Sequence, residues 1–99
     1  MSEDPLKIFE KIDPDFLNLV RNTEESAFSD GAVPKKFKFL MAMILEATLN
    51  HDHGVKALAQ AAIQAGVTKN EIMEALRVTQ YISGAAPIYT SAVGLKDLL

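Results

Sequence analysis

The chain of 99 residues contains no cysteine. Without a thiol it can form no disulfide, no thiolate metal site and no iron–sulfur cluster, and it has no cysteine nucleophile. Apolar residues make up 48% of the chain and charged residues 23%, which is ordinary for a folded protein and excludes a disordered one. The length fits a single domain over residues 1–99.

The chain also lacks a basic excess and a long apolar run. Thirteen acids against ten bases give a net charge of −3, which offers little to a nucleic acid. The longest mostly apolar run, 37–49, is too short to span a bilayer and is interrupted by Lys38 and Glu46. The first four residues are acidic in character, unlike a signal peptide. We therefore expect a soluble, cytoplasmic protein that binds neither nucleic acid nor membrane.

Two Asp-Pro pairs mark helix starts near the N-terminus. Asp4 and Asp13 can each cap a helix, and the proline that follows has no N–H to leave unpaired. The pairs predict a short helix to about Ile12 and a second helix over 14–28. Residues 1–30 hold eight acids and three bases, a net charge of −5, whereas residues 31–99 carry +2. We interpret 1–30 as acidic N-terminal helices that form a solvated layer over a more apolar body; the alternative is an acidic docking surface.

The middle of the chain predicts two more helices. Pro34 opens one that runs to about Leu49. Asn50 is a candidate N-cap for the next, which Gly66 ends in a left-handed conformation. The apolar residues of this fourth helix follow helical spacing: Val55, Leu58, Ala59, Ala62 and Ile63.

The last part of the chain predicts a fifth and a sixth helix. Thr68 and Glu71 have the spacing of a capping box, in which each side chain accepts a hydrogen bond from the other residue's N–H. A Ser-Gly-Ala-Ala-Pro break over 83–87 then starts the final helix. No segment alternates in polarity for long enough to form a strand. The predicted fold class is all-α, a compact bundle of about six helices.

The third helix is apolar on nearly every side. Only Lys38, Glu46 and Thr48 are polar between Phe37 and Leu49. A helix of this kind must be covered all round, and a chain of this length has too few helices to do so. Burying one Leu or Phe is worth about 1.5–3 kcal/mol, so we predict an obligate homo-oligomer whose subunits complete the cover.

Glu46 is the one carboxylate of this apolar helix and a candidate catalytic residue. A carboxyl group buried without a partner keeps its proton more readily and can act as a general acid. The alternative is structural: the side chain reaches outward or pairs with a Lys or Arg of another helix.

The segment Asn50-His51-Asp52-His53-Gly54 holds both histidines of the chain. It lies at the predicted start of the fourth helix, where free N–H groups and the helix dipole favour an anion. We predict His51 and His53 as catalytic proton donors, and Asn50, Asp52 and Gly54 as substrate-binding residues, with Gly54 giving a small carboxylate access to the backbone. The alternatives are that Asn50 and Asp52 only cap the helix, or that the two histidines and Asp52 bind a metal in a non-helical connection.

The stretch from Val33 to about Leu98 resembles the carboxymuconolactone decarboxylase and alkylhydroperoxidase D-like family. The resemblance is strongest in Val-Pro-Lys-Lys at 33–36, in Ala-Ala-Ile-Gln-Ala-Gly-Val-Thr-Lys-Asn-Glu-Ile at 61–72, and in the break at 84–87. It implies that 33–98 is an all-α core that assembles as trimers or hexamers.

The resemblance also implies where a catalytic pattern would lie. Peroxidase-type members use a Glu, a Cys-x-x-Cys pair and a His four residues on, and laid without gaps these fall at Phe39, His51, Gly54 and Leu58. The thiol peroxidase reaction is therefore excluded. Decarboxylase-type members lack the cysteines and keep the His where this chain has Leu58, while His53 falls where some peroxidase-type members have a His between the cysteines.

Together these observations predict a homo-hexamer or homo-trimer that acts as a lyase or isomerase on a small carboxylate or lactone by proton transfer, with Glu46, His51 and His53 as its catalytic groups. No metal or cofactor is expected for this reaction. The alternatives are a ligand-binding or scaffolding oligomer without catalysis, and a metal-binding protein.

Overall fold

The computed structural model describes residues 4–99, and every regular element in that range is helical. This confirms the predicted all-α class with six helices. The elements in chain order are η1 (Pro5–Ile8), α1 (Phe9–Ile12), α2 (Pro14–Phe28), α3 (Lys35–Thr48), α4 (Asp52–Gln64), α5 (Lys69–Ser83) and α6 (Ala86–Leu95).

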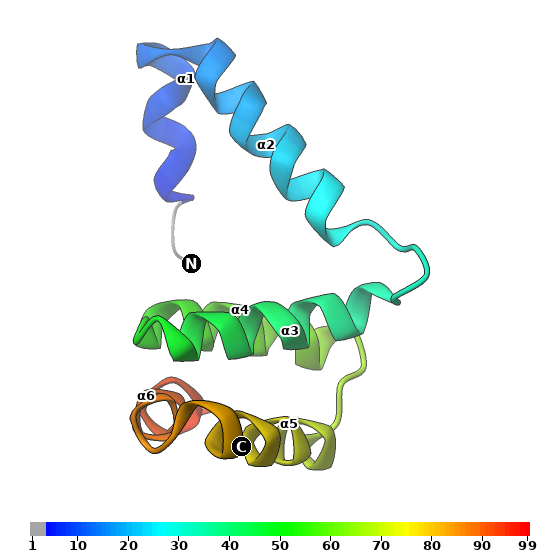
Figure 1. The fold of residues 1–99 in the computed structure, drawn as a ribbon. Coiled ribbons are helices and arrows are strands. Elements are labelled where there is room, and N and C mark those ends of the chain that lie inside the picture. The colour runs from blue at the N-terminus through cyan, green and yellow to red at the C-terminus, as the bar shows by residue number, and fades with distance from the viewer. Residues whose placement is uncertain (1–3) are drawn as a thin grey trace.

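Helices α3 to α6 form the body of the protein. Figure 1 shows α3 and α4 side by side, with α5 and α6 below them. The buried residues of α3 and α4 include three alanines, Ala47, Ala59 and Ala62, whose small side chains suit a close approach of two helices. The buried core consists of Met43, Ala47, Val55, Ala59, Ala62, Val67, Ile72, Leu76 and Leu95.

The helix boundaries follow the signals in the sequence. The Asp13 side chain accepts a hydrogen bond from Phe16 N–H at 3.1 Å, which confirms the predicted cap of α2. The reciprocal bonds between Thr68 and Glu71 are 2.8 and 3.1 Å long, which confirms the capping box of α5. Gly66 has a φ of +107° and ends α4 as expected.

The N-terminal helices do not cover the body. We call Pro5–Phe28 the arm; none of its residues is buried, and Figure 1 shows it as a V whose apex, between α1 and α2, lies away from α3. The prediction of a helical layer over the body is therefore wrong. The radius of gyration of 14.6 Å exceeds the value of about 13 Å expected for a compact domain of this length, because of the arm.

The base of the arm is fixed to α3 by three contacts. The Phe28 and Phe39 rings stack with centroids 5.0 Å apart. Lys38 Nζ donates to the Ser29 carbonyl at 2.7 Å, and the Lys35 N–H donates to the Asp30 carboxylate at 2.7 Å. These contacts set the direction in which α2 leaves the body.

Apolar side chains remain exposed on the outer side of α3. Met41, Leu45 and Leu49 follow one another at intervals of four residues and are 54–61% exposed. A single chain thus leaves part of the apolar helix uncovered, as its sequence predicts. Among residues 4–99, no helix is both long enough and apolar enough to cross a membrane.

Candidate functional site

Glu46 and His51 form a carboxylate–imidazole pair where α3 ends. Glu46 Oε2 lies 3.0 Å from His51 Nδ1, which is hydrogen-bonding distance. The Glu46 side chain is 31% exposed and the His51 side chain 58% exposed. A carboxylate that accepts the Nδ1–H of an imidazole fixes the ring tautomer and leaves Nε2 to exchange a proton with a ligand. Glu46 therefore pairs with His51, the neighbouring candidate catalytic residue, and not with a Lys or Arg as the structural alternative supposed.

The backbone at the end of α3 brings this pair together. The His51 N–H donates to the Glu46 carbonyl at 3.0 Å, and the Asn50 N–H donates to the Ala47 carbonyl at 3.0 Å. These are the two hydrogen bonds of a Schellman motif, in which the residue after the helix is left-handed. Asn50 occupies that position with a φ of +62°, which asparagine tolerates better than most residues. The reversal of the chain there places His51 beside Glu46.

The prediction that Asn50 caps the fourth helix is wrong. His51 is the N-cap of α4, and its side chain makes no capping hydrogen bond. Asn50 instead terminates α3, and its Oδ1 accepts a hydrogen bond from Thr90 Oγ1 of α6 at 3.3 Å. Asparagine is the usual substitute for glycine in the left-handed position after a helix, so this signal was present in the sequence. The hydrogen bond from Thr90 could not be predicted from local sequence, because Thr90 lies 40 residues from Asn50 and reaches it only through tertiary packing.

Gly54 makes room for Glu46 in the first turn of α4. A Cβ atom at this position would overlap the Glu46 carboxylate. The space that the glycine leaves is therefore filled by Glu46, which differs from the substrate access predicted for Gly54. This close approach orients the carboxylate toward His51.

His53 lies apart from this pair. Its side chain is fully exposed, and its Nε2 is 3.9 Å from Asp52 Oδ1. Asp52 also accepts a hydrogen bond from the His53 N–H at 2.8 Å, so it places a negative charge at the positive end of α4. The first turn of α4 thus already carries an anion.

The metal-binding alternative has no site within residues 4–99 of one chain. In this range no three His, Asp or Glu side chains come close enough together to hold a metal ion. His51 precedes α4 and His53 lies in its first turn, so the two rings do not share the non-helical connection that a common metal would need.

The Glu46–His51 pair also lies where the resemblance places the cysteine pair of other proteins. The two cysteines align with His51 and Gly54. The structure puts an imidazole at the first position and the Glu46 carboxylate against the second. A carboxylate–imidazole pair thus stands where the resemblance places a thiol pair.

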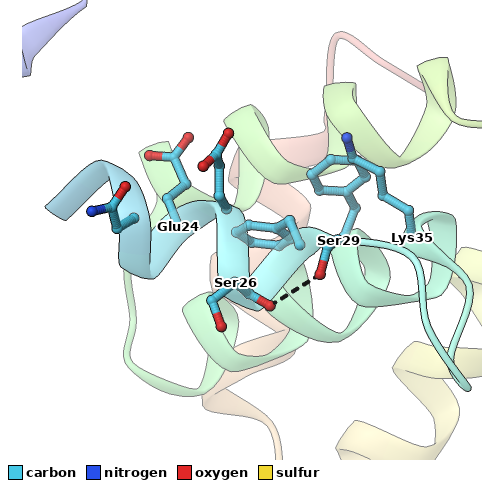
Figure 2. A pocket seen from close by; sticks show the side chains of 8 residues that line it. Glu24, Ser26, Ser29 and Lys35 are labelled. Carbon is cyan, nitrogen blue, oxygen red and sulfur yellow. Dashed lines mark hydrogen bonds between the residues drawn. The ribbon is translucent and has the colours of Figure 1, made fainter. Parts of the chain in front are cut away.

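A separate hollow lies between α2 and α3. It has a volume of about 690 Å³ and is lined by Asn22, Glu24, Glu25, Ser26, Phe28, Ser29, Lys35 and Phe39. Figure 2 shows Glu24, Ser26, Ser29 and Lys35 around it, with the Ser29 hydroxyl donating to the Ser26 carbonyl at 3.3 Å. The hollow combines two aromatic rings with carboxylates but holds no pair of groups arranged for proton transfer, so the Glu46–His51 pair is the better candidate for chemistry.

Two comparisons with known proteins point to one family, and a third finds an uncharacterised relative. The model of the carboxymuconolactone decarboxylase family matches residues 14–94. An uncharacterised protein of Methanocaldococcus jannaschii is 27% identical over 88 residues, which cover 89% of this chain and 81% of that protein. The crystal structure of a carboxymuconolactone decarboxylase family protein from Legionella pneumophila superposes with a TM-score of 0.85, at 26% identity, over 92% of this chain and 81% of that one.

Proposed function

This chain belongs to the carboxymuconolactone decarboxylase family, and from that premise we propose that it is a lyase or isomerase that moves a proton on a small lactone or carboxylate. The observation that carries the proposal is the hydrogen bond of 3.0 Å between Glu46 Oε2 and His51 Nδ1. The absence of cysteine excludes a thiol reaction, and Leu58, which aligns with the histidine of decarboxylase-type relatives, cannot carry a proton.

In this reaction His51 Nε2 takes a proton from the carbon next to the substrate carbonyl. Glu46 accepts the Nδ1–H and stabilises the imidazolium that forms. In an isomerase the proton returns to a different carbon. In a decarboxylase the substrate carboxylate loses CO₂, the electron pair of the broken C–C bond moves into the adjacent carbonyl, and the Nε2–H of a protonated His51 then protonates the carbon that carried CO₂. The isomerase route closes its proton balance within the pair, whereas the decarboxylase route takes one proton from water for each CO₂ released.

The charges around the pair favour a lactone over a free acid. Glu46 and Asp52 both place carboxylates near His51, and Asp52 partly neutralises the positive end of α4. A neutral lactone does not meet this repulsion, and the Asp52 and Asn50 oxygens can accept hydrogen bonds from its hydroxyl groups. We therefore assign Asn50 and Asp52 to substrate binding, and Gly54 to the support of Glu46.

The experiment is thermal unfolding with a panel of small lactones and carboxylates, followed by a turnover assay on any compound that binds. A ligand at one hundred times its dissociation constant stabilises the native state by about 2.7 kcal/mol, which is an easily measured shift. We expect the shift with a lactone to disappear in His51→Ala. Turnover should fall at least about a hundredfold in Glu46→Gln, because general acid–base catalysis contributes about that factor or more.

His53→Ala is the matched control, since it removes the other histidine, which is fully exposed and outside the pair. The control should keep both ligand shift and turnover. If no lactone or carboxylate stabilises the wild type, the non-catalytic scaffold becomes the better account of the chain. Equal losses in His51→Ala and His53→Ala would contradict the role of the pair.

A further inference from the structure

Helix α6 contacts the turn between α3 and α4 on both sides of His51. Before His51, the Thr90 hydroxyl donates to Asn50 Oδ1 at 3.3 Å. After His51, Gly94 lies so close to the first turn of α4 that a Cβ atom would overlap the Asp52 carbonyl oxygen. Both neighbours of His51 in the chain are thus in contact with one helix, although Thr90 lies 40 residues beyond Asn50.

The spacing within α6 explains why these two residues face the turn. Thr90 and Gly94 are four residues apart, which places them one turn apart on the same side of the helix. Gly94 is buried together with Ser91 and Leu95, so this side of α6 packs against the rest of the body. Thr90 lies at the edge of that contact and is half-buried, which leaves its hydroxyl within reach of Asn50.

The Asn50 side chain depends on Thr90 for a partner. Asn50 has a φ of +62°, a left-handed conformation that is unfavourable for most residues other than glycine. The two Schellman hydrogen bonds fix its backbone, but they leave the side-chain amide free to rotate. Within residues 4–99, the bond with Thr90 is the one side-chain hydrogen bond that Asn50 makes. Thr90 therefore sets the orientation of the Asn50 amide.

Thr90 differs from Thr79 of α5 in having a second acceptor. Thr79 Oγ1 donates to the Ala75 carbonyl at 2.8 Å, the bond to the preceding turn that a helical threonine commonly makes. Thr90 Oγ1 has the same kind of partner, the Ala86 carbonyl at 3.2 Å, in addition to Asn50 Oδ1. A hydroxyl has one proton, so Thr90 shares it between the two acceptors. The contact with Asn50 is thus the feature that separates the two threonines.

From these contacts we propose that Thr90 is a positioning residue for the Glu46–His51 pair. Its hydroxyl orients Asn50, and the turn at Asn50 keeps the His51 ring within hydrogen-bonding distance of the Glu46 carboxylate. Both hydrogen bonds of the Thr90 hydroxyl go to other groups than the pair, so Thr90 acts through Asn50. Its effect on turnover rests on the proposed function, whereas its effect on the geometry of the pair does not.

Thr90→Val tests this role, because it removes the hydroxyl and keeps the branched shape of the side chain. The ¹⁵N chemical shifts of the His51 imidazole, measured at a pH that keeps the ring neutral, should change because the ring is no longer held with its proton on Nδ1. Thr90→Ser keeps a hydroxyl and should restore the wild-type shifts. Thr79→Val is the matched control, since it loses the same bond to the preceding turn and no contact with Asn50.

A double variant tests whether Thr90 acts through Asn50. Asn50→Gly keeps the left-handed turn, which glycine adopts without strain, and removes the group that Thr90 contacts. In the Asn50→Gly background, Thr90→Val should cause no further change in the His51 shifts, because the contact is already absent. Effects of the two substitutions that simply add would contradict the proposal.

Turnover gives a second readout. Thr90→Val should lower kcat about tenfold, less than the hundredfold that a displacement of about 1 Å can cost, and Thr90→Ser should recover most of the loss. His51 shifts that stay at their wild-type values in Thr90→Val, or that change equally in Thr79→Val, would overturn the positioning role. Shifts that respond as expected in a protein that turns over no lactone or carboxylate would support this role and count against the proposed function alone.

Discussion

At the scale of single residues, the candidate site depends on two positions with unusual backbone demands. Asn50 takes a left-handed conformation that turns the chain from α3 into α4, and this turn puts His51 beside Glu46. Gly54 has no Cβ, and the Glu46 carboxylate uses that space. Neither residue needs to touch a substrate to matter for the chemistry, since each sets the geometry of the pair.

A pair of glycine variants tests this interpretation. In Gly54→Ala the new methyl group would overlap Oε2, Cδ and Cγ of the Glu46 side chain, which would have to turn aside. Alanine favours the helix by about 1 kcal/mol, so the stability should change by less than about 1 kcal/mol. The displaced carboxylate should lose its hydrogen bond to His51. A change in the ¹⁵N chemical shifts of the His51 imidazole would report this loss.

Gly94→Ala provides the comparison. Its Cβ would lie 2.7 Å from Val55 Cγ1 and 2.8 Å from the Asp52 carbonyl oxygen, which belongs to the backbone and cannot move aside. Urea unfolding should show a loss of about 1–3 kcal/mol. The interpretation fails if Gly54→Ala is the more destabilised variant and Gly94→Ala is neutral.

At the scale of helices, the sequence predicts a helix end correctly where the groups that cap this end lie close together in the chain. The capping box of α5 is one example: Thr68 and Glu71 bond to each other's backbone within four residues. The pKa of Glu71 is lowered mainly because its carboxylate accepts a hydrogen bond from the Thr68 backbone N–H. Partial burial opposes this shift, whereas the positive charge of Lys36 and the Thr68 side chain add to it.

This pKa shift predicts the pH dependence of the stability. Because the pKa of Glu71 is lower in the folded chain, the unfolded chain binds more protons. The stabilisation by ionised Glu71 is therefore complete above the unfolded pKa of about 4.3. It is lost as the pH falls through the folded pKa. The difference in unfolding free energy between wild type and Glu71→Gln should therefore shrink between about pH 6 and pH 3. A constant difference across that range would contradict the role of the charge.

At the scale of the whole molecule, one chain leaves part of its apolar surface exposed outside the buried core. The arm has no buried residue, and Leu45, Val78 and Tyr81 of the body are 60–85% exposed. Exposed apolar surface on this scale is typical of an interaction site. The family match and the solved relative agree with the all-α fold of the chain.

The homo-oligomer that the sequence predicts would make the melting temperature depend on protein concentration. Association stabilises the folded state by mass action, so Tm should rise between about 1 and 100 μM. A Tm that is constant over this concentration range, as for a monomer, would be evidence against assembly.

The sequence alone determined the helical class, most helix boundaries and the exclusion of thiol chemistry. Those features depend on composition and on groups a few residues apart, such as the Asp13 cap, the Thr68–Glu71 box and the stripe of Val55, Ala59 and Ala62. It also identified Glu46 and His51 as candidates, but as separate residues of two different helices. Only the tertiary structure decided that they form a pair, that His53 stands apart, and that the acidic helices extend as an arm. These outcomes depend on a left-handed turn at Asn50 and on contacts between distant segments, which spacing along the chain does not encode.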